Sequence, residues 1–257
     1  MGMERTALDL SEDAVLGGRL RLRQPKRGHR VGHDAILLAA AVPARAGEAV
    51  VDLGAGVGAA GLALAVRVGG IKLTLVELAP QLAALAAENA RLNGLSAQVA
   101  ALDVAAPARA FAAAGLRPEQ TARVLMNPPF NDPARQRASP DRGRRLAHVA
   151  LRATLVAWTK TAARLLRPRG TLTLIWRADG LGDVLEALKP AFGAATVLPI
   201  YAKPDESAIR VLVRATKASR APLQLLPGLV LHDPAGRATV AANAILRAGE
   251  ALPLAQI

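Results

Sequence analysis

Asp52-Leu-Gly-Ala-Gly-Val-Gly58 is the stretch of sequence that decides the fold. It ends an apolar run that begins at Ala49, and a helical pattern over about 59–68 follows it. Glycines at alternate positions allow a tight turn between strand and helix, and they let a ligand approach the backbone closely. The spacing also satisfies Gly-x-Gly-x-x-Ala, with Ala59 last, so the glycines alone leave a dinucleotide site open. The stretch predicts a cofactor loop in an α/β fold.

Short apolar runs alternate with helical patterns on both sides of this loop, from about residue 49 to 215. This alternation is typical of βαβ units that build a mostly parallel sheet with helices on both faces. Further strands are predicted over 71–77, 98–102, 123–126, 171–176, 196–201 and 208–213. Helices are predicted over 80–93, where Pro80 opens and Asn93-Gly94 closes the helix, and over 106–115, 143–166, 181–188 and 239–247.

Three segments are expected along the chain. Residues 1–30 form a basic N-terminal extension or hairpin, in which Leu16 to Gln24 alternates as a half-buried strand with an outward arginine row. Residues 31–215 form the main α/β domain. Residues 216–257 have weak periodicity and are expected to be an extension of the same domain.

The composition excludes several classes of protein. The longest uncharged apolar run, Leu53 to Val66, is too short for the roughly 20 residues that span a bilayer, so no membrane helix is expected. The N-terminus carries acidic residues where a secretory signal needs basic ones, namely Glu4, Asp9, Glu12 and Asp13. The chain has no cysteine, so a disulfide framework and a thiolate metal site are excluded. A cytoplasmic protein without a metal is expected.

The charge balance is strongly basic, with 33 basic and 20 acidic residues and a net charge of +13. A balance of this kind is expected of a protein that meets a polyphosphate, so it favours nucleic acid as the partner. Arginine supplies most of the positive charge, and genome base composition alone can also produce an arginine-rich and alanine-rich chain. The charge is therefore suggestive only until motifs are considered.

Two carboxylates follow the next two predicted strands. Glu77 ends the second strand, where an acid can accept both ribose hydroxyls of a nucleoside, and Asp103 follows the third, where it can accept from an adenine amino group. Each could instead be a solvated loop acid. With the cofactor loop they predict a set of cofactor-binding residues, namely Asp52, Gly54, Ala55, Gly56, Gly58, Glu77, Leu78, Asp103 and Val104.

Asn127-Pro-Pro-Phe130 follows the fourth predicted strand. Together with the glycine loop and Glu77, this motif resembles the Rossmann-like class I methyltransferases that modify exocyclic or amide nitrogens. The resemblance covers roughly residues 30–215 and implies a seven-stranded, mostly parallel sheet with one antiparallel strand. It also implies S-adenosylmethionine as the cofactor, with Asn127 beside it.

The resemblance makes Asn127, Pro128, Pro129 and Phe130 the predicted reaction centre. Consecutive prolines fix two φ angles and remove two donors, so the surrounding carbonyls stay free to accept. An aromatic amine can donate to the Asn127 side-chain oxygen and the Pro128 carbonyl, with its lone pair aimed at the methyl group, while Phe130 stacks on the base. Alternatively, the motif is a simple strand-ending turn and Phe130 a core residue. We expect Trp158 to be a core residue too.

The segment order and Arg27-Gly-His-Arg-Val-Gly-His-Asp-Ala-Ile-Leu-Leu38 resemble bacterial tRNA adenine-N6 methyltransferases that modify the adenine beside the anticodon of a valine tRNA. By position, this resemblance makes His33 and Asp34 residues that line the cofactor methionine. Arginines and a lysine flank both motifs and are predicted to contact RNA phosphates, namely Arg19, Arg21, Arg23, Lys26, Arg27, Arg135, Arg137, Arg142, Arg144 and Arg145.

Several substrates share the Asn-Pro-Pro-Phe motif. The arginines around the motif favour RNA as the acceptor, and the resemblance to the tRNA enzymes implies methylation of the exocyclic N6 of an adenine in tRNA. A guanine-N2 RNA methyltransferase, which also suits Phe130, and a protein glutamine methyltransferase are the enzyme alternatives. A catalytically silent protein that binds S-adenosylmethionine or a dinucleotide is the alternative without enzyme activity.

Overall fold

The structure is a computed structural model that describes residues 9–27, 30–129 and 140–256, with the backbone alone over 140–149. Within these residues, nine strands make the central sheet in the order β10-β8-β9-β7-β6-β3-β4-β5, with β11 also paired to β8. The strands are β3 (Ala49–Leu53), β4 (Lys72–Glu77), β5 (Ala97–Ala101), β6 (Thr121–Met126), β7 (Leu166–Arg177), β8 (Phe192–Tyr201), β9 (Ala208–Lys217), β10 (Gln224–Leu225) and β11 (Leu229–Val230). β9 is antiparallel to both of its neighbours, and the remaining pairs are parallel.

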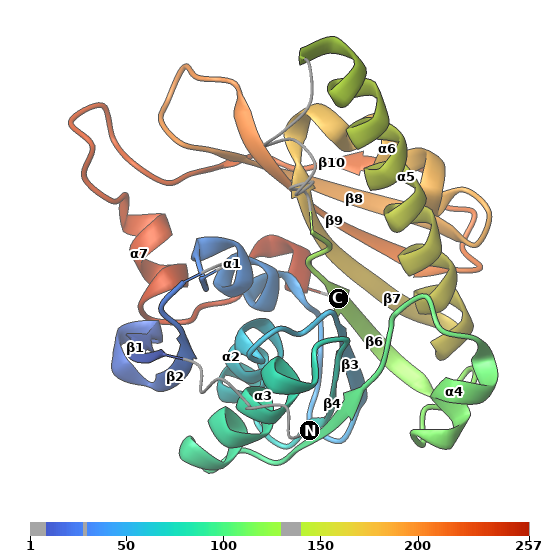
Figure 1. Ribbon diagram of the computed structural model, residues 1–257. Helices are drawn as coiled ribbons and strands as arrows, with labels where there is room; N and C mark the ends of the chain where they lie inside the picture. The colour runs from blue at the N-terminus through green and yellow to red at the C-terminus, as the bar shows by residue number, and fades with distance from the viewer. Residues whose placement is uncertain (1–8, 28–29, 130–139, 257) are drawn as a thin grey trace.

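Helices cover both faces of the sheet (Figure 1). One face carries α1 (His33–Ala41), α2 (Ala59–Val68) and α3 (Pro80–Leu92), and the other carries α4 (Ala108–Ala113), α5 (Pro140–Leu165) and α6 (Leu181–Leu188). Two apolar clusters fill the spaces between sheet and helices. The strands are nearly continuous apolar runs because both faces of a covered parallel sheet are buried.

The predicted mostly parallel α/β fold is confirmed, and the strand count differs from the implied seven. Seven strands have five residues or more, and the two additional strands, β10 and β11, have two residues each. Both lie in the C-terminal segment and add to β8 through short parallel pairings. Two-residue strands carry no alternation that a sequence pattern can reveal.

The N-terminal residues form an antiparallel hairpin of β1 (Leu10–Val15) and β2 (Leu20–Pro25). The predicted alternation is present in β2, where Leu20 and Leu22 are buried and Arg21 is exposed. The strand begins at Leu20, because a 3-10 turn occupies Leu16–Gly18.

The C-terminal segment packs on the main domain. Its helix α7 (Val240–Leu246) lies beside α1 in Figure 1. The Leu252 N–H donates to the Ala40 carbonyl at 2.8 Å, and Ala242 and Ile245 belong to the same apolar cluster as α1. These contacts bury apolar surface that α1 would otherwise expose.

Candidate active site

The glycine loop and Asn127 lie side by side where the strand order reverses. From β3 the chain winds outward through β4 and β5, and it then returns to place β6 on the other side of β3. Leu53 and Met126 are paired in the sheet, so the loop after β3 and the motif after β6 begin at neighbouring strand ends. In open α/β sheets, ligands bind at such a switch point, outside the carboxyl ends of the strands.

The glycine loop is held from several sides. The N–H groups of Gly54 and Ala55 donate to the Val76 carbonyl at 2.8 and 2.9 Å. Gly54, Gly56 and Gly58 have φ of 72°, 57° and 90°, a region that side chains other than glycine rarely adopt. A Cβ built on Gly56 would find no atom of the described residues within 4 Å, so space for a ligand adjoins the backbone there.

Asp52 lies beneath this loop. Its side chain is buried, and its carboxylate accepts from the Gly61 N–H at 2.9 Å in the first turn of α2. Burial raises the pKa of Asp52, the hydrogen bond from the Gly61 N–H lowers it, and the Glu77 charge raises it, so that together they bring this pKa to about 7. This geometry makes Asp52 a support that joins β3 to α2.

Glu77 bridges the glycine loop and the next strand end. One carboxylate oxygen accepts from the Gly56 N–H at 2.8 Å, and the other accepts from the Ala79 N–H at 2.8 Å. Each oxygen has a second lone pair, so the carboxylate can still accept from ligand hydroxyls. Leu78 beside it is 62% exposed, which is unusual for a leucine next to so much buried structure.

The third strand end supplies Asp103 and Val104. Asp103 is exposed, and its carboxylate accepts from the Ala105 N–H at 2.8 Å, which closes the turn after β5. Val104 is buried, and its carbonyl accepts from the Thr161 hydroxyl of α5 at 2.8 Å. These contacts hold α5 against the loop that follows β5.

Asn127 has the most informative environment in the site. Its side-chain oxygen Oδ1 is buried, and no donor in the described parts of the chain reaches it. A buried acceptor without a donor is costly, by about 1–3 kcal/mol, so an oxygen of this kind calls for a ligand donor. Pro128 is buried and Pro129 exposed, while Phe130 lies outside the described residues.

Trp158 of α5 was missed as a site residue. A Cβ built on Gly54 would lie 2.2 Å from Cη2 and 2.7 Å from Cζ3 of the Trp158 indole, so the ring edge rests directly on the glycine loop. Trp158 is only partly buried, and the apolar cluster of the α5 face packs against it. The sequence carried no signal for this contact, since the two residues are joined only by the fold.

His33 and Asp34 begin α1. His33 is exposed, whereas the Asp34 carboxylate accepts from Arg210 Nε at 2.9 Å, at the start of β9. The pair joins α1 to the antiparallel strand at the carboxyl edge of the sheet. A ligand contact of Asp34 would share this carboxylate with Arg210.

The N-terminal basic residues have acidic or carbonyl partners within the chain. Arg21 and Arg23 both pair with Glu12, Arg23 also with Glu88 of α3, and Lys26 pairs with Asp9. Arg19 donates to the carbonyls of Leu16 and Ala248. An RNA phosphate would compete with these partners. Arg27 is exposed, Arg135 and Arg137 lie outside the described residues, and only backbone is described for Arg142, Arg144 and Arg145.

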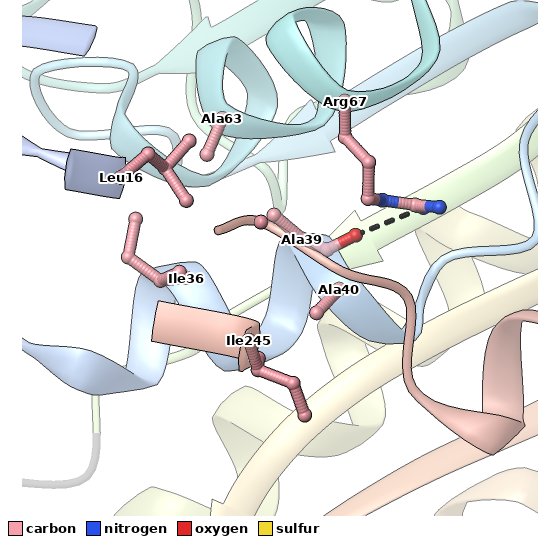
Figure 2. A pocket seen from close by; sticks show the side chains of 8 residues that line it. Leu16, Ile36, Ala39, Ala40, Ala63, Arg67 and Ile245 are labelled. Atoms are coloured by element: carbon pink, nitrogen blue, oxygen red, sulfur yellow. Dashed lines mark hydrogen bonds between the residues drawn. The ribbon is translucent and has the colours of Figure 1, made fainter. Parts of the chain in front are cut away.

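A small apolar pocket lies elsewhere, among α1, α2 and α7 (Figure 2). Its cavity volume is about 10 Å³, and Leu16, Ile36, Ile245 and Arg67 contribute to its lining. Ligand pockets usually exceed roughly 300 Å³, so this space does not rival the carboxyl edge as a cofactor site. Over the described ranges, no helix is long and apolar enough to cross a membrane, and no group of three metal-binding side chains occurs.

The residues at the carboxyl edge fit a cofactor with a nucleoside. Glu77 offers carboxylate lone pairs suited to ribose hydroxyls, and exposed Leu78 offers an apolar surface suited to a flat base. The open space beside the Gly56 backbone permits close approach of the rest of the cofactor.

Comparisons with known proteins agree with this geometry. The family model of the methyltransferase small domain matches residues 29–203. The tRNA1(Val) (adenine(37)-N6)-methyltransferase of Serratia proteamaculans is 30% identical over 193 residues, covering 73% of this chain and 71% of that protein. Its namesake from Dickeya chrysanthemi is 27% identical over 224 residues, covering 85% of this chain and 86% of that protein.

A solved structure is also similar. The crystal structure of a predicted O-methyltransferase from Agrobacterium tumefaciens has a TM-score of 0.72 and 29% identity, and it covers 85% of this chain and 98% of its own. The chain thus belongs to the methyltransferase small domain family and is a methyltransferase that uses S-adenosylmethionine as its cofactor.

Proposed function

We propose that this methyltransferase modifies the exocyclic N6 of an adenine in tRNA. The buried and unpartnered Asn127 Oδ1 carries the proposal, because it is an acceptor placed at the switch point beside the glycine loop. An exocyclic amine has two N–H groups, one for Asn127 Oδ1 and one for the Pro128 carbonyl. A hydroxyl group has only one hydrogen to donate, so it could satisfy only one of the two acceptors. The pair of acceptors therefore favours a nitrogen substrate over an oxygen substrate.

The cofactor is proposed to lie over the glycine loop, between Gly54 and Gly58. Glu77 would hold its ribose hydroxyls, and Leu78, Asp103 and Val104 would surround its adenine. When bound, S-adenosylmethionine supplies an electrophilic methyl group on a cationic sulfur. His33 and Asp34 are proposed to border the methionine end, with Asp34 also paired to Arg210.

The residues of this chain act mainly by positioning. Asn127 and Pro128 fix the amine so that its lone pair faces the methyl group, and Phe130 is proposed to stack on the base. Alignment of this kind lowers the barrier substantially, and a misplacement of about 1 Å typically costs about a hundredfold in rate. The amine becomes acidic once the new bond has formed, so its proton leaves without a strong base.

The names of the relatives and the net charge of +13 support tRNA as the acceptor. The hairpin arginines are proposed to reach phosphates only by exchanging their acidic partners. The basic residues at 135–145, together with Arg27, complete the proposed RNA surface. Binding through phosphates predicts an affinity that falls steeply with salt.

A transfer assay with labelled S-adenosylmethionine tests the proposal, with bulk tRNA lacking the modification and total protein as competing acceptors. We expect label in tRNA and N6-methyladenosine among its nucleosides by mass spectrometry. N2-methylguanosine instead would identify a guanine-N2 enzyme, and label confined to protein would favour glutamine methylation; either outcome contradicts the proposal.

Asn127→Ala tests the reaction centre. We expect methyl transfer to fall by about a hundredfold, because the amine loses one of its two acceptors. Cofactor affinity, measured by calorimetry, should change much less than the rate. Asn243→Ala, in the C-terminal helix α7, is the matched control and should keep full activity. Unchanged transfer by the Asn127 variant would remove this residue from the reaction centre.

A further inference from the structure

Asn89 of α3 and Asn93, which caps the C-terminus of this helix, take the place of a strand beside β2. The two residues are four positions apart at the C-terminal end of the helix, and both side chains reach β2. Asn93 accepts from the Arg21 N–H at 2.8 Å and donates to the Arg21 carbonyl at 2.7 Å. Asn89 accepts from the Arg23 N–H at 2.8 Å and donates to the Arg23 carbonyl at 3.0 Å.

Asn89 makes one contact that Asn93 lacks. Its side-chain Nδ2 also donates to the Val57 carbonyl at 3.0 Å, inside the glycine loop. The residue is fully buried, and its one oxygen and both amide hydrogens have partners. A satisfied amide in such a place has a single orientation, so it fixes the positions of both partners.

The contact controls one peptide plane of the loop. The Val57 carbonyl points to Asn89, and the Gly58 N–H of the same peptide donates to the Ala55 carbonyl at 2.8 Å. The plane is therefore held at both ends. Without Asn89 the carbonyl end is released, and the loop between Gly56 and the start of α2 gains a rotation that the native contacts exclude.

The hairpin is also joined to the N-terminus of α1, where His33 and Asp34 lie. Gln24 of β2 is buried, its amide donates to Asp13 at 2.7 Å, and its oxygen accepts from the Val31 N–H at 2.8 Å. Val31 leads directly into α1, which begins with His33 and Asp34. The hairpin thus contacts the glycine loop through Asn89 and the N-terminus of α1 through Gln24.

We infer that Asn89 is a positioning residue that couples docking of the β1–β2 hairpin to cofactor binding at the glycine loop. The inference rests on the proposed placement of the cofactor over this loop. Coupling of two sites is reciprocal, so a cofactor that orders the loop also stabilises the docked hairpin, and a docked hairpin raises cofactor affinity by the same factor. The hairpin and its basic residues would then present one fixed surface to RNA when the cofactor is bound.

The pair Asn89→Ala and Asn93→Ala separates coupling from simple loss of structure. Each variant loses two bonds to β2 and one further bond, which joins Asn93 to the Asn89 carbonyl in one case and Asn89 to the Val57 carbonyl of the glycine loop in the other. S-adenosylhomocysteine binding by calorimetry should weaken about tenfold in Asn89→Ala, the usual effect of leaving one buried group without its partner. In Asn93→Ala it should weaken less than about threefold. Equal losses in the two variants would overturn the inference.

Hydrogen exchange gives a second readout that does not depend on activity. In the unaltered protein, S-adenosylhomocysteine should slow exchange of the β2 amides of Arg21 and Arg23. This protection should persist in Asn93→Ala at Arg23 and disappear in Asn89→Ala. If the cofactor product binds tightly to the unaltered protein and leaves β2 exchange unchanged, the coupling does not exist.

Gly56→Val distinguishes failure of the inference from failure of the proposed cofactor site. A valine there fills the open space beside the loop and should abolish S-adenosylhomocysteine binding. Unaltered binding by this variant would refute the placement of the cofactor itself. Lost binding combined with equal effects of the two asparagine variants would refute only the coupling through Asn89.

Discussion

Gly54→Ala should destabilise the protein by about 2–5 kcal/mol. At φ 72° an alanine costs about 1–2 kcal/mol, because its Cβ crowds the backbone. Its Cβ would also lie 2.2 Å from Trp158 Cη2, and overpacking of this kind costs about 1–3 kcal/mol more. Gly56→Ala is the matched control, since it has φ 57° and nothing within 4 Å of its Cβ. It should cost only the first amount, about 1–2 kcal/mol.

Urea unfolding of both alanine variants, each with and without Trp158→Leu, measures the two contributions separately. Leucine removes the indole edge and keeps an apolar side chain on α5. In that background the excess cost of Gly54→Ala over Gly56→Ala should vanish, which is a coupling energy of about 1–3 kcal/mol. Strictly additive effects would refute the contact between Trp158 and the loop, and equal costs of the two alanines in the native background would refute it as well.

Two further predictions concern buried charge. Asp52 binds its proton more tightly in the folded than in the unfolded chain, so its contribution to stability is fully present below about pH 4 and is lost as the pH rises to about 7. The loss is of the order of 4 kcal/mol, and Asp52→Asn should flatten the pH dependence of the unfolding free energy over this window, whereas an unchanged slope would contradict the raised pKa. Arg123→Met should cost about 1–3 kcal/mol, because both Glu48 oxygens lose a 2.9 Å bond from Arg123 and keep only the Arg45 N–H at 3.0 Å and Arg167 at 3.5 Å. Adding Glu48→Gln should restore most of that stability, and calorimetric unfolding that shows no recovery would mean that the pair acts through packing.

The helices and strands could be predicted well wherever a segment has a clear apolar run, helical periodicity or a capping residue of its own. The strand Ala49–Leu53 and the helices Ala59–Val68 and Leu181–Leu188 have the expected bounds, and Pro80 opens α3 as predicted. β7 and β9 extend beyond their predicted ranges, because pairing with neighbouring strands continues past the apolar run. The helix α1 was not predicted, since its seven buried residues face the core on all sides and have no polar face to mark a helical period.

The site was predictable only in part, for a related reason. The glycine loop, Glu77 and Asn127 stand directly after strands, so the chain order alone places them at one edge of the sheet. The partners of these groups come from distant segments. Trp158 on Gly54 and Asn89 on Val57 depend on how helices cross the sheet, and the pairing of Arg23 with Glu88 depends on packing of the hairpin against α3. None of these contacts leaves a pattern in the local sequence.

Asn89 and Asn93 also have a consequence for solubility. β2 has one edge on β1, and its other edge would present free N–H and C=O groups to any extended chain. Asn89 and Asn93 occupy these groups at Arg21 and Arg23, so no second strand can be added there. A short hairpin that would otherwise be a template for aggregation or for exchange between molecules is thereby closed by two side chains.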